Sequence, residues 1–216
     1  MSTLILYLNS IILASATFPS GFSAALASVF RVDVREVTPR FMLMLLFPIV
    51  VICIVVWLLI PELLYFNSAS PELLALAVFL VPVALLIEII LFALVFYQQT
   101  GHFPKQLKLQ NFWRQKLSPG YYLLLFAIAV MEEFLYRQIC FAIFENYFHF
   151  PIWSVLIITS LMYGLNHLFF GLSTVLSKTL MGLLYGSLYI LGDHSILLPI
   201  ITHSLQNHLM IRILKT

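Results

Sequence analysis

Long uninterrupted apolar runs restrict what this chain can fold into more than any other feature. The clearest run occupies residues 41–60 (FMLMLLFPIVVICIVVWLLI) and contains no charged residue. A helix needs about 20 predominantly apolar residues to cross the hydrocarbon core of a bilayer. Inside that core a spanning segment must satisfy its own backbone hydrogen bonds, which a helix does by itself. The sequence therefore predicts an all-α membrane protein.

The composition of the whole chain supports this interpretation. Hydrophobic residues make up 62% of the 216 residues and charged residues only 9%, whereas soluble domains carry about 25% charged residues. So few charges argue against a soluble enzyme, a disordered chain or a nucleic-acid binder, and a net charge of +2 provides no basic field. The two cysteines, Cys53 and Cys140, lie in apolar runs, which favours buried thiols over a disulfide framework or a zinc ribbon.

We expect residues 1–216 to form a single integral membrane domain, a polytopic helical bundle of about seven spans. The first segment contains Pro19 and Gly21, which predict an interrupted helix or a re-entrant pair. A cleaved signal peptide is the alternative, because Ala14-Ser15-Ala16 resembles a cleavage site, but no Lys or Arg precedes it. The seven predicted spans are residues 4–30, 41–60, 72–97, 121–144, 150–170, 173–190 and 195–214.

Basic residues are concentrated in alternate loops. The loops around 61–71, 145–149 and 191–194 contain no Lys or Arg. By the positive-inside rule, this pattern predicts a multi-pass protein with a cytoplasmic C-terminus, which we place in a bacterial plasma membrane. The polar, aromatic stretch of residues 98–120 is either an amphipathic segment on the inner leaflet or a solvated loop. The basic residues near predicted cytoplasmic ends are Arg31, Arg35, Arg40, Lys105, Lys108, Arg114, Lys116, Lys178, Arg212 and Lys215.

Ionisable side chains inside a span are functional hypotheses, because each costs several kcal/mol in hydrocarbon. The fourth span contains AVMEEFLYRQIC, where Glu133 and Arg137 are four residues apart and can pair on one helix face. Glu132 lies about 100° further round the helix and has no partner on it. Its apolar surroundings penalise the charged form, as suits a general base working near neutral pH. The alternative is that both carboxylates only pack the bundle.

Two later spans contain polar pairs with the same four-residue spacing, Tyr163 with His167 and His203 with Asn207. Each pair shares a helix face, and the second could direct two hydrogen-bond donors at a developing oxyanion. Bonds to backbone carbonyls or between helices are the alternatives. The rise per residue places Glu132 and His203 near mid-membrane but His167 nearer the cytoplasmic face.

Two more charges lie in the apolar segments. Glu88 in the third span could pair with Arg137 or line a pathway. Lys178 lies near the start of the sixth span, where we expect its long side chain to reach the membrane interface.

Three motifs follow one another along the chain: Glu132-Glu133-x-x-x-Arg137, Tyr163-x-x-x-His167 and His203-x-x-x-Asn207. In this order they resemble the CAAX protease and bacteriocin-processing family, also called the abortive-infection family. Its members are membrane-embedded proteases similar to the type II CAAX prenyl endopeptidase. The resemblance covers residues 118–211. The second motif of the family usually begins with Phe, where this chain has Tyr163.

The resemblance implies an intramembrane endopeptidase of the glutamic type, with a peptide or membrane-protein substrate in the lipid phase. It implies that Glu132 and His167 activate a water and that His203 and Asn207 hold the oxyanion. It further implies that Glu133 and Arg137 support the site. No cofactor is expected, and the sequence contains no HExxH zinc motif.

Other mechanisms and functions use the same residues. Glu132, His167 and His203 could hold a catalytic zinc ion, since three protein ligands plus water form such a site. Acids and histidines inside spans also mark transporters and proton relays, although no internal repeat is visible. A catalytically silent scaffold is a third interpretation. Neither the substrate nor the oligomeric state follows from the sequence.

Overall fold

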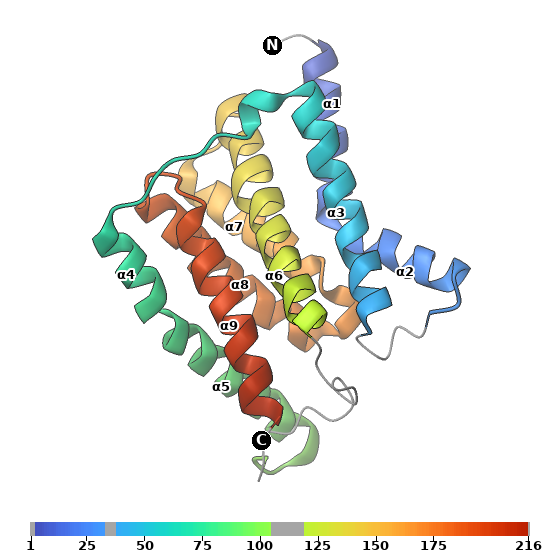
Figure 1. The fold of residues 1–216 in the computed structure, drawn as a ribbon, viewed down its shortest axis with the longest axis vertical. Coiled ribbons are helices and arrows are strands. Elements are labelled where there is room, and N and C mark those ends of the chain that lie inside the picture. Colours follow the sequence, from blue (N-terminus) through green and yellow to red (C-terminus); the bar gives the residue numbers. More distant parts are fainter. Residues whose placement is uncertain (1–2, 33–37, 105–118, 216) are drawn as a thin grey trace.

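The computed structural model describes residues 3–32, 38–104 and 119–215, and these contain helices and no strand (Figure 1). The all-α expectation is confirmed for this part of the chain. In chain order the helices are α1 (Thr3–Thr17), α2 (Pro19–Val29), α3 (Pro39–Leu59), α4 (Pro71–Phe79), α5 (Val81–Thr100), α6 (Pro119–Glu133), α7 (Ile152–Leu165), α8 (Leu172–Leu191) and α9 (Leu197–Lys215).

Short segments of other helical types connect these elements. Phe134–Cys140 and Ile143–Tyr147 are π-helical and continue from α6, while Pro61–Leu63 and Leu168–Phe170 are 3-10 turns. Most of the predicted surface stretch 98–120 lies outside the described residues, as do Arg35, Lys105, Lys108, Arg114 and Lys116.

Fewer described helices meet the length and hydropathy expected of a membrane span than the sequence predicts. Among the described helices, three are long and apolar enough to cross a bilayer, namely Pro39–Leu59, Pro71–Thr100 and Leu172–Leu191. The bent pair of α1 and α2 would be a fourth. The predicted count of seven is therefore not confirmed. The fourth predicted span contains charged residues, and its α-helix ends at Glu133, where a π-helical segment begins. The fifth predicted span corresponds to α7, which has only 14 residues.

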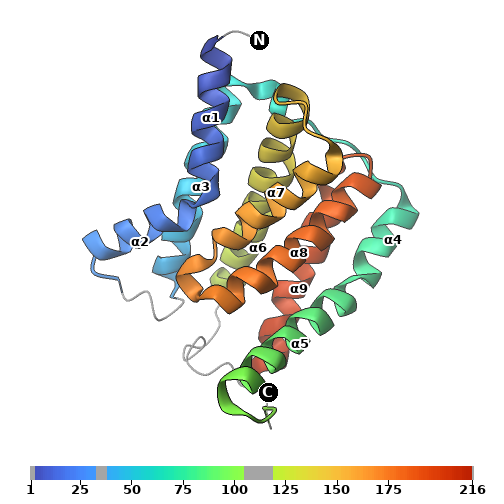
Figure 2. The ribbon, with the colours of Figure 1, turned by 180° about the vertical axis from the view of Figure 1, so that it is seen from behind.

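The first predicted span is interrupted where the sequence indicates. Helices α1 and α2 meet at 62°, and the break falls at Phe18, which has φ −145°. Pro19 follows at the first position of α2, where its missing N–H is tolerated but where it ends the preceding helix. Figure 2 shows α1 rising beside α3 while α2 turns away from the bundle.

Helices α7 and α8 pack closely because glycines lie between them. A Cβ atom added at Gly182 would lie 2.9 Å from Ser160 Cα, and one at Gly164 would lie 2.8 Å from the carbonyl oxygen of Val175. Small residues at such crossings allow helix backbones to approach in membranes. The close approach brings the end of α7, with its candidate histidine, against the start of α8.

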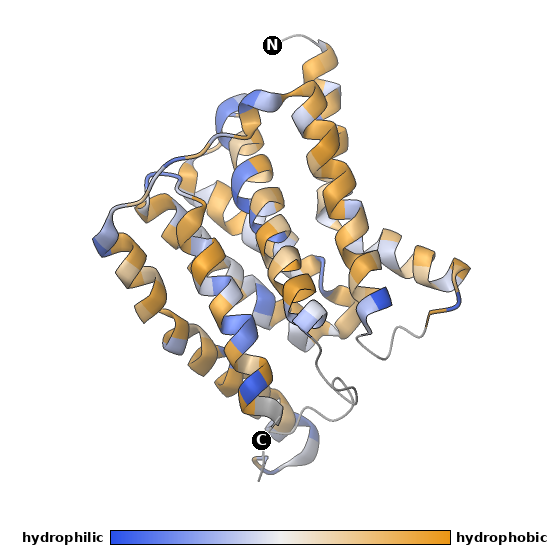
Figure 3. Ribbon diagram, in the orientation of Figure 1, coloured by the Kyte–Doolittle hydropathy of each residue, from blue (hydrophilic) through white to orange (hydrophobic). Residues whose placement is uncertain are grey.

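Apolar side chains cover the outside of the bundle and polar ones gather inside it. In Figure 3, α1, α3, α4 and α5 are largely hydrophobic, while hydrophilic positions occur along α6, α8 and α9. Exposed side chains include Trp57 and Leu58, at 62% and 65%. An outer surface of this kind fits lipid and not water, so the helices are those of an integral membrane protein.

Candidate functional site

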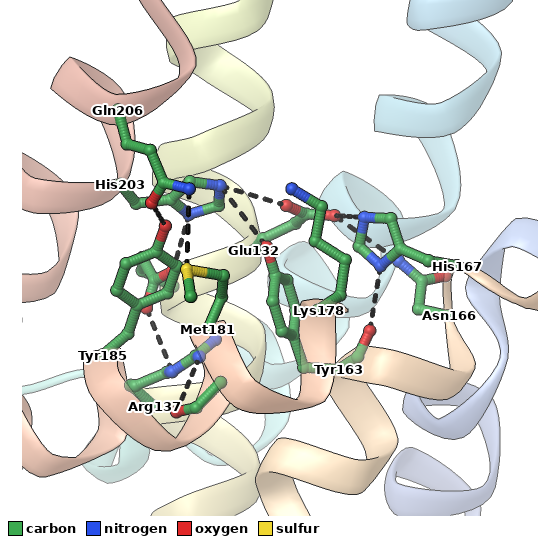
Figure 4. A network of polar contacts seen from close by, with 12 residues as sticks. Glu132, Arg137, Tyr163, Asn166, His167, Lys178, Met181, Tyr185, His203 and Gln206 are labelled. Atoms are coloured by element: carbon green, nitrogen blue, oxygen red, sulfur yellow. Dashed lines mark hydrogen bonds and ion pairs between the residues drawn. The ribbon is translucent and has the colours of Figure 1, made fainter. Parts of the chain in front are cut away.

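Glu132 lies at the centre of a group of polar side chains contributed by three parts of the chain (Figure 4). Its Oε1 is 3.9 Å from His167 Nε2 and 3.5 Å from Asn166 Nδ2, and its Oε2 is 3.9 Å from His203 Nε2. Glu132 is buried, with 5% of its surface exposed. The carboxyl group at the end of α6 thus faces both candidate histidines.

The end of α7 determines where His167 points. The α-helix stops at Leu165, and His167 begins the 3-10 turn that follows. Its Nδ1 lies 2.9 Å from the carbonyl oxygen of Tyr163, which can only accept a hydrogen bond. Nδ1 therefore carries the proton, and the neutral ring turns an unprotonated Nε2 towards Glu132. The expected difference in depth between His167 and Glu132 does not separate these groups.

Glu133 holds a second buried cluster directly beside the first. Its Oε1 accepts a hydrogen bond from His203 Nδ1 at 2.7 Å, and its Oε2 lies 3.1 Å from Arg137 Nε. The ion pair is the one that the four-residue spacing predicts. Arg137 also donates to the carbonyl oxygen of Gly182 at 3.3 Å and lies 4.7 Å from the centre of the Tyr163 ring. These contacts connect α6, α8 and α9 at the site.

The hydrogen bond from His203 to Glu133 determines when the other ring nitrogen, Nε2, can donate a hydrogen bond. Because Glu133 accepts the Nδ1 proton, the neutral ring presents Nε2 as an acceptor towards Glu132 and towards the Tyr163 hydroxyl, which is 3.4 Å away. Nε2 becomes a donor only when the ring takes up a second proton. The Glu133 carboxylate lies against Nδ1 of this ring, and the ring of Tyr185 stacks on it with centroids 4.8 Å apart.

A cavity of about 480 Å³ brings the candidate residues onto a shared surface. Glu132, His167, His203 and Asn207 all line it. Asn207 lies one turn beyond His203 on α9, so its amide faces the same space. Apolar residues from four helices form most of the remaining wall: Met42, Leu45 and Ile49 of α3, Leu91, Phe92 and Val95 of α5, Leu125 and Ile128 of α6, and Met210 and Ile211 of α9.

Glu88 and Lys178 form an ion pair at this cavity, with Lys178 Nζ 2.9 Å from Glu88 Oε1. Gln206 Nε2 donates to Glu88 Oε2 at 2.6 Å, and Tyr185 donates to the Gln206 side-chain oxygen. Lys178 thus directs its amino group at Glu88, and Arg137 is not the partner of Glu88. The reason is that α5 packs against α8, whereas Arg137 is held by Glu133.

Sequence reasoning missed Asn166 and Gln206, although both are polar residues beside a selected histidine motif. No other signal in one sequence separates them from ordinary helix residues. For zinc, the structure describes no group of three or more His, Cys, Asp and Glu side chains that could hold a metal ion in residues 3–32, 38–104 and 119–215.

Comparison with protein families identifies the region that contains these motifs. Residues 114–209 match the family described as type II CAAX prenyl endopeptidase Rce1-like, which confirms the resemblance seen in the three motifs. The matched region begins before α6 and ends within α9, and so includes every candidate catalytic residue. No curated protein and no solved structure matches the chain.

Proposed function

We propose that this chain, which belongs to the type II CAAX prenyl endopeptidase Rce1-like family over residues 114–209, is an intramembrane endopeptidase that uses a glutamate-activated water. The observation that carries the proposal is the position of the Glu132 carboxyl, 3.9 Å from the Nε2 atoms of both His167 and His203 at one cavity. Such distances are too long for direct hydrogen bonds, but they suit groups that act on one small molecule between them.

In the proposed first step, a water donates one hydrogen bond to Glu132 and one to the unprotonated Nε2 of His167. Glu132 takes a proton as the water oxygen bonds to the carbonyl carbon of the peptide, and the carbonyl π electrons move to the oxygen. The imidazolium form of His203 and the amide of Asn207 donate hydrogen bonds to that oxyanion. Their position on one face of α9 supports this role.

In the second step the oxyanion re-forms the carbonyl and the C–N bond breaks. The proton held by Glu132 passes to the leaving nitrogen, so that the products are a carboxyl group and an amine. Glu132 is then ready to accept a proton from the next water. Glu133 accepts the Nδ1 proton of His203 and stabilises the imidazolium form that acts in the reaction, and Arg137 holds Glu133 in place, which is how these two residues support the site.

The walls of the cavity support a substrate that enters from the lipid phase. They are mainly apolar and come from α3, α5, α6 and α9. An apolar peptide or the end of a membrane protein can therefore enter from lipid without a desolvation cost. The distribution of basic residues predicts that the C-terminus lies in the cytoplasm, and we propose a bacterial plasma membrane as the location of the enzyme.

The test is to replace Glu132 with Gln, which keeps the shape of the side chain but removes its basicity. Membrane peptides are compared by mass spectrometry in cells carrying the wild-type or the Glu132→Gln protein. We expect fragments that depend on the wild-type protein to disappear. Glu72→Gln, the same change at an exposed position of α4, serves as the control and should retain cleavage. A Glu132→Gln protein that still cleaves would refute the assignment of the base.

Metal dependence is tested separately on purified enzyme. A strong zinc chelator should leave the cleavage rate unchanged if Glu132 acts as a base. Loss of activity with chelator and recovery with zinc would instead support the zinc mechanism on the same residues.

A further inference from the structure

Asn166 connects the candidate base to a part of the chain outside the region matched by the family. Its Oδ1 accepts a hydrogen bond from the backbone N–H of Ser20 at 2.9 Å, and its Nδ2 lies 3.5 Å from Glu132 Oε1. Asn166 and Ser20 are both buried, with 6% and 4% of their surfaces exposed. One amide side chain therefore bridges the first turn of α2 and the carboxyl group of Glu132.

The Ser20 N–H is available because of its position in α2. The first four N–H groups of a helix have no partner within it, and Ser20 follows Pro19 at the start of α2. The two helices α1 and α2 are bent by 62° at this point, and the first turn of α2 lies beside Asn166 at the end of α7. Ser20 also lines the cavity, where its Oγ is buried with no hydrogen-bond partner among the described residues.

The contact with Ser20 decides which way the planar amide of Asn166 faces. The oxygen and nitrogen of an amide are distinguished by their partners, and a backbone N–H can bond only to the oxygen. Once Oδ1 is held by Ser20, the NH2 group must point the other way, towards Glu132. A donor in that position stabilises the ionised carboxylate and limits its rotation.

We propose that Asn166 is a positioning residue for Glu132, and that the bent pair of α1 and α2 completes the site by holding Asn166. This inference rests on the proposed function, in which Glu132 is the base. It assigns a role in the reaction to residues 19–20, which lie well before the matched region of residues 114–209. The helix pair α1 and α2 then contributes to the geometry of the active site as well as to membrane anchoring.

Several charged or titratable groups face Glu132 and also influence its protonation. They come from α5, α6, the π-helical segment, α7 and the turn after it, α8 and α9, whereas the cavity-lining residues of α3 are apolar. The groups are Glu88, Glu133, Tyr136, Arg137, Tyr163, His167, Lys178, Tyr185 and His203. Every variant below leaves these side chains unchanged.

The first experiment replaces Asn166 with Asp, which has the same shape and can still accept from Ser20. The variant loses the donor to Glu132 and adds a negative charge beside it. We expect kcat to fall about 10- to 100-fold, the effect of losing a hydrogen bond to a charged group, with little change in KM. The acid limb of the pH–rate profile should move to higher pH, because a second carboxylate disfavours ionisation of the first.

The substrate for these measurements is a peptide recovered in the mass-spectrometric comparison, synthesised with a fluorophore and a quencher. Asn146→Asp is the matched control, since it adds the same charge at an exposed position of the π-helical segment Ile143–Tyr147, away from the cavity. Its kcat and pH–rate profile should equal those of the wild-type enzyme. A change of fold would reduce the active fraction of either variant but would not move the profile.

The second experiment tests the connection to α2 without changing Asn166. Ser20→Pro removes the N–H that Asn166 accepts, at a first-turn position where helices tolerate proline. We expect this change to lower kcat and to move the pH–rate profile in the wild-type background. In an Asn166→Ala background, where the acceptor is absent, the same change should have no further effect, because coupled residues are non-additive.

The outcomes separate this inference from the proposed function. If Glu132→Gln is inactive but Asn166→Asp has wild-type kcat and pH–rate profile, Asn166 is not a positioning residue and Glu132 remains the base. Additive effects of Ser20→Pro and Asn166→Ala would likewise overturn the role of α2. If Glu132→Gln retains activity, the proposed function fails, and with it the reason for positioning this side chain.

Discussion

Replacing Glu133 with Gln tests how the buried charges of this site are balanced. In the wild-type protein one oxygen of Glu133 lies 3.1 Å from Arg137 Nε and the other lies 2.7 Å from His203 Nδ1. Two unit charges at 3.1 Å attract by about 5 kcal/mol at an effective dielectric constant of about 20. A glutamine oxygen still accepts one hydrogen bond but provides no charge.

The variant therefore leaves the guanidinium of Arg137 without its counter-charge in a site where the ion-paired side chains are at most 2% exposed. Breaking one partner of a buried pair destabilises a protein by about 3–5 kcal/mol. We expect the free energy of unfolding, measured by reversible denaturation in mixed detergent micelles, to fall by that amount. Activity should fall as well, because the imidazolium form of His203 in the proposed reaction loses the carboxylate that stabilises it.

Two further variants identify the cause. The double variant Glu133→Leu, Arg137→Met removes both charges, and its stability should return to within about 2 kcal/mol of the wild type, while activity remains lost. Glu72→Gln, at an exposed position, should reduce stability by less than about 1 kcal/mol. If Glu133→Gln costs no more than that control, the pair contributes no more than a surface ion pair and our reasoning about burial is wrong.

Three other substitutions test the packing around the cavity. Lys178→Met should destabilise the protein by about 2 kcal/mol in the same unfolding assay, because Glu88 loses its cation 2.9 Å away. Gly182→Ala should cost about 1–3 kcal/mol, since the added methyl would lie 2.9 Å from Ser160 Cα; a neutral result would mean that α7 and α8 can move apart freely. Tyr163→Phe should lose about 1 kcal/mol of stability, because the hydroxyl makes only a 3.4 Å contact with His203 Nε2. This variant should keep measurable peptidase activity. Complete inactivity would assign the hydroxyl to the reaction.

Contacts within one helix were predictable from spacing. The four-residue separation of Glu133 and Arg137 predicted an ion pair, and the structure contains it at 3.1 Å. The same spacing placed His203 and Asn207 on one side of α9, and both line the cavity. The bend near Pro19 followed from the chemistry of proline. In each case the local geometry of a helix is enough to decide which side chains meet.

Contacts between helices were not predictable in the same way. Glu88 meets Lys178, Glu133 meets His203, and Ser20 meets Asn166 across 90, 70 and 146 positions of the chain. Periodicity assigns a residue to a face but does not say which helix that face meets. The count of spans was not confirmed either, and the charges and the π-helical geometry after Glu133 lie where side chains pack inside the bundle.

By itself, the sequence determined that this chain is helical and lipid-embedded, and that a few polar residues must avoid the lipid. Apolar runs, helix periodicity and proline geometry are local properties, so no knowledge of neighbouring helices was needed. The tertiary structure decided which of those polar residues meet. It brought Glu132 between two histidines and paired Glu88 with Lys178, because the packing of α5 to α9 is determined by the close fit of side chains from distant segments and not by any one of them.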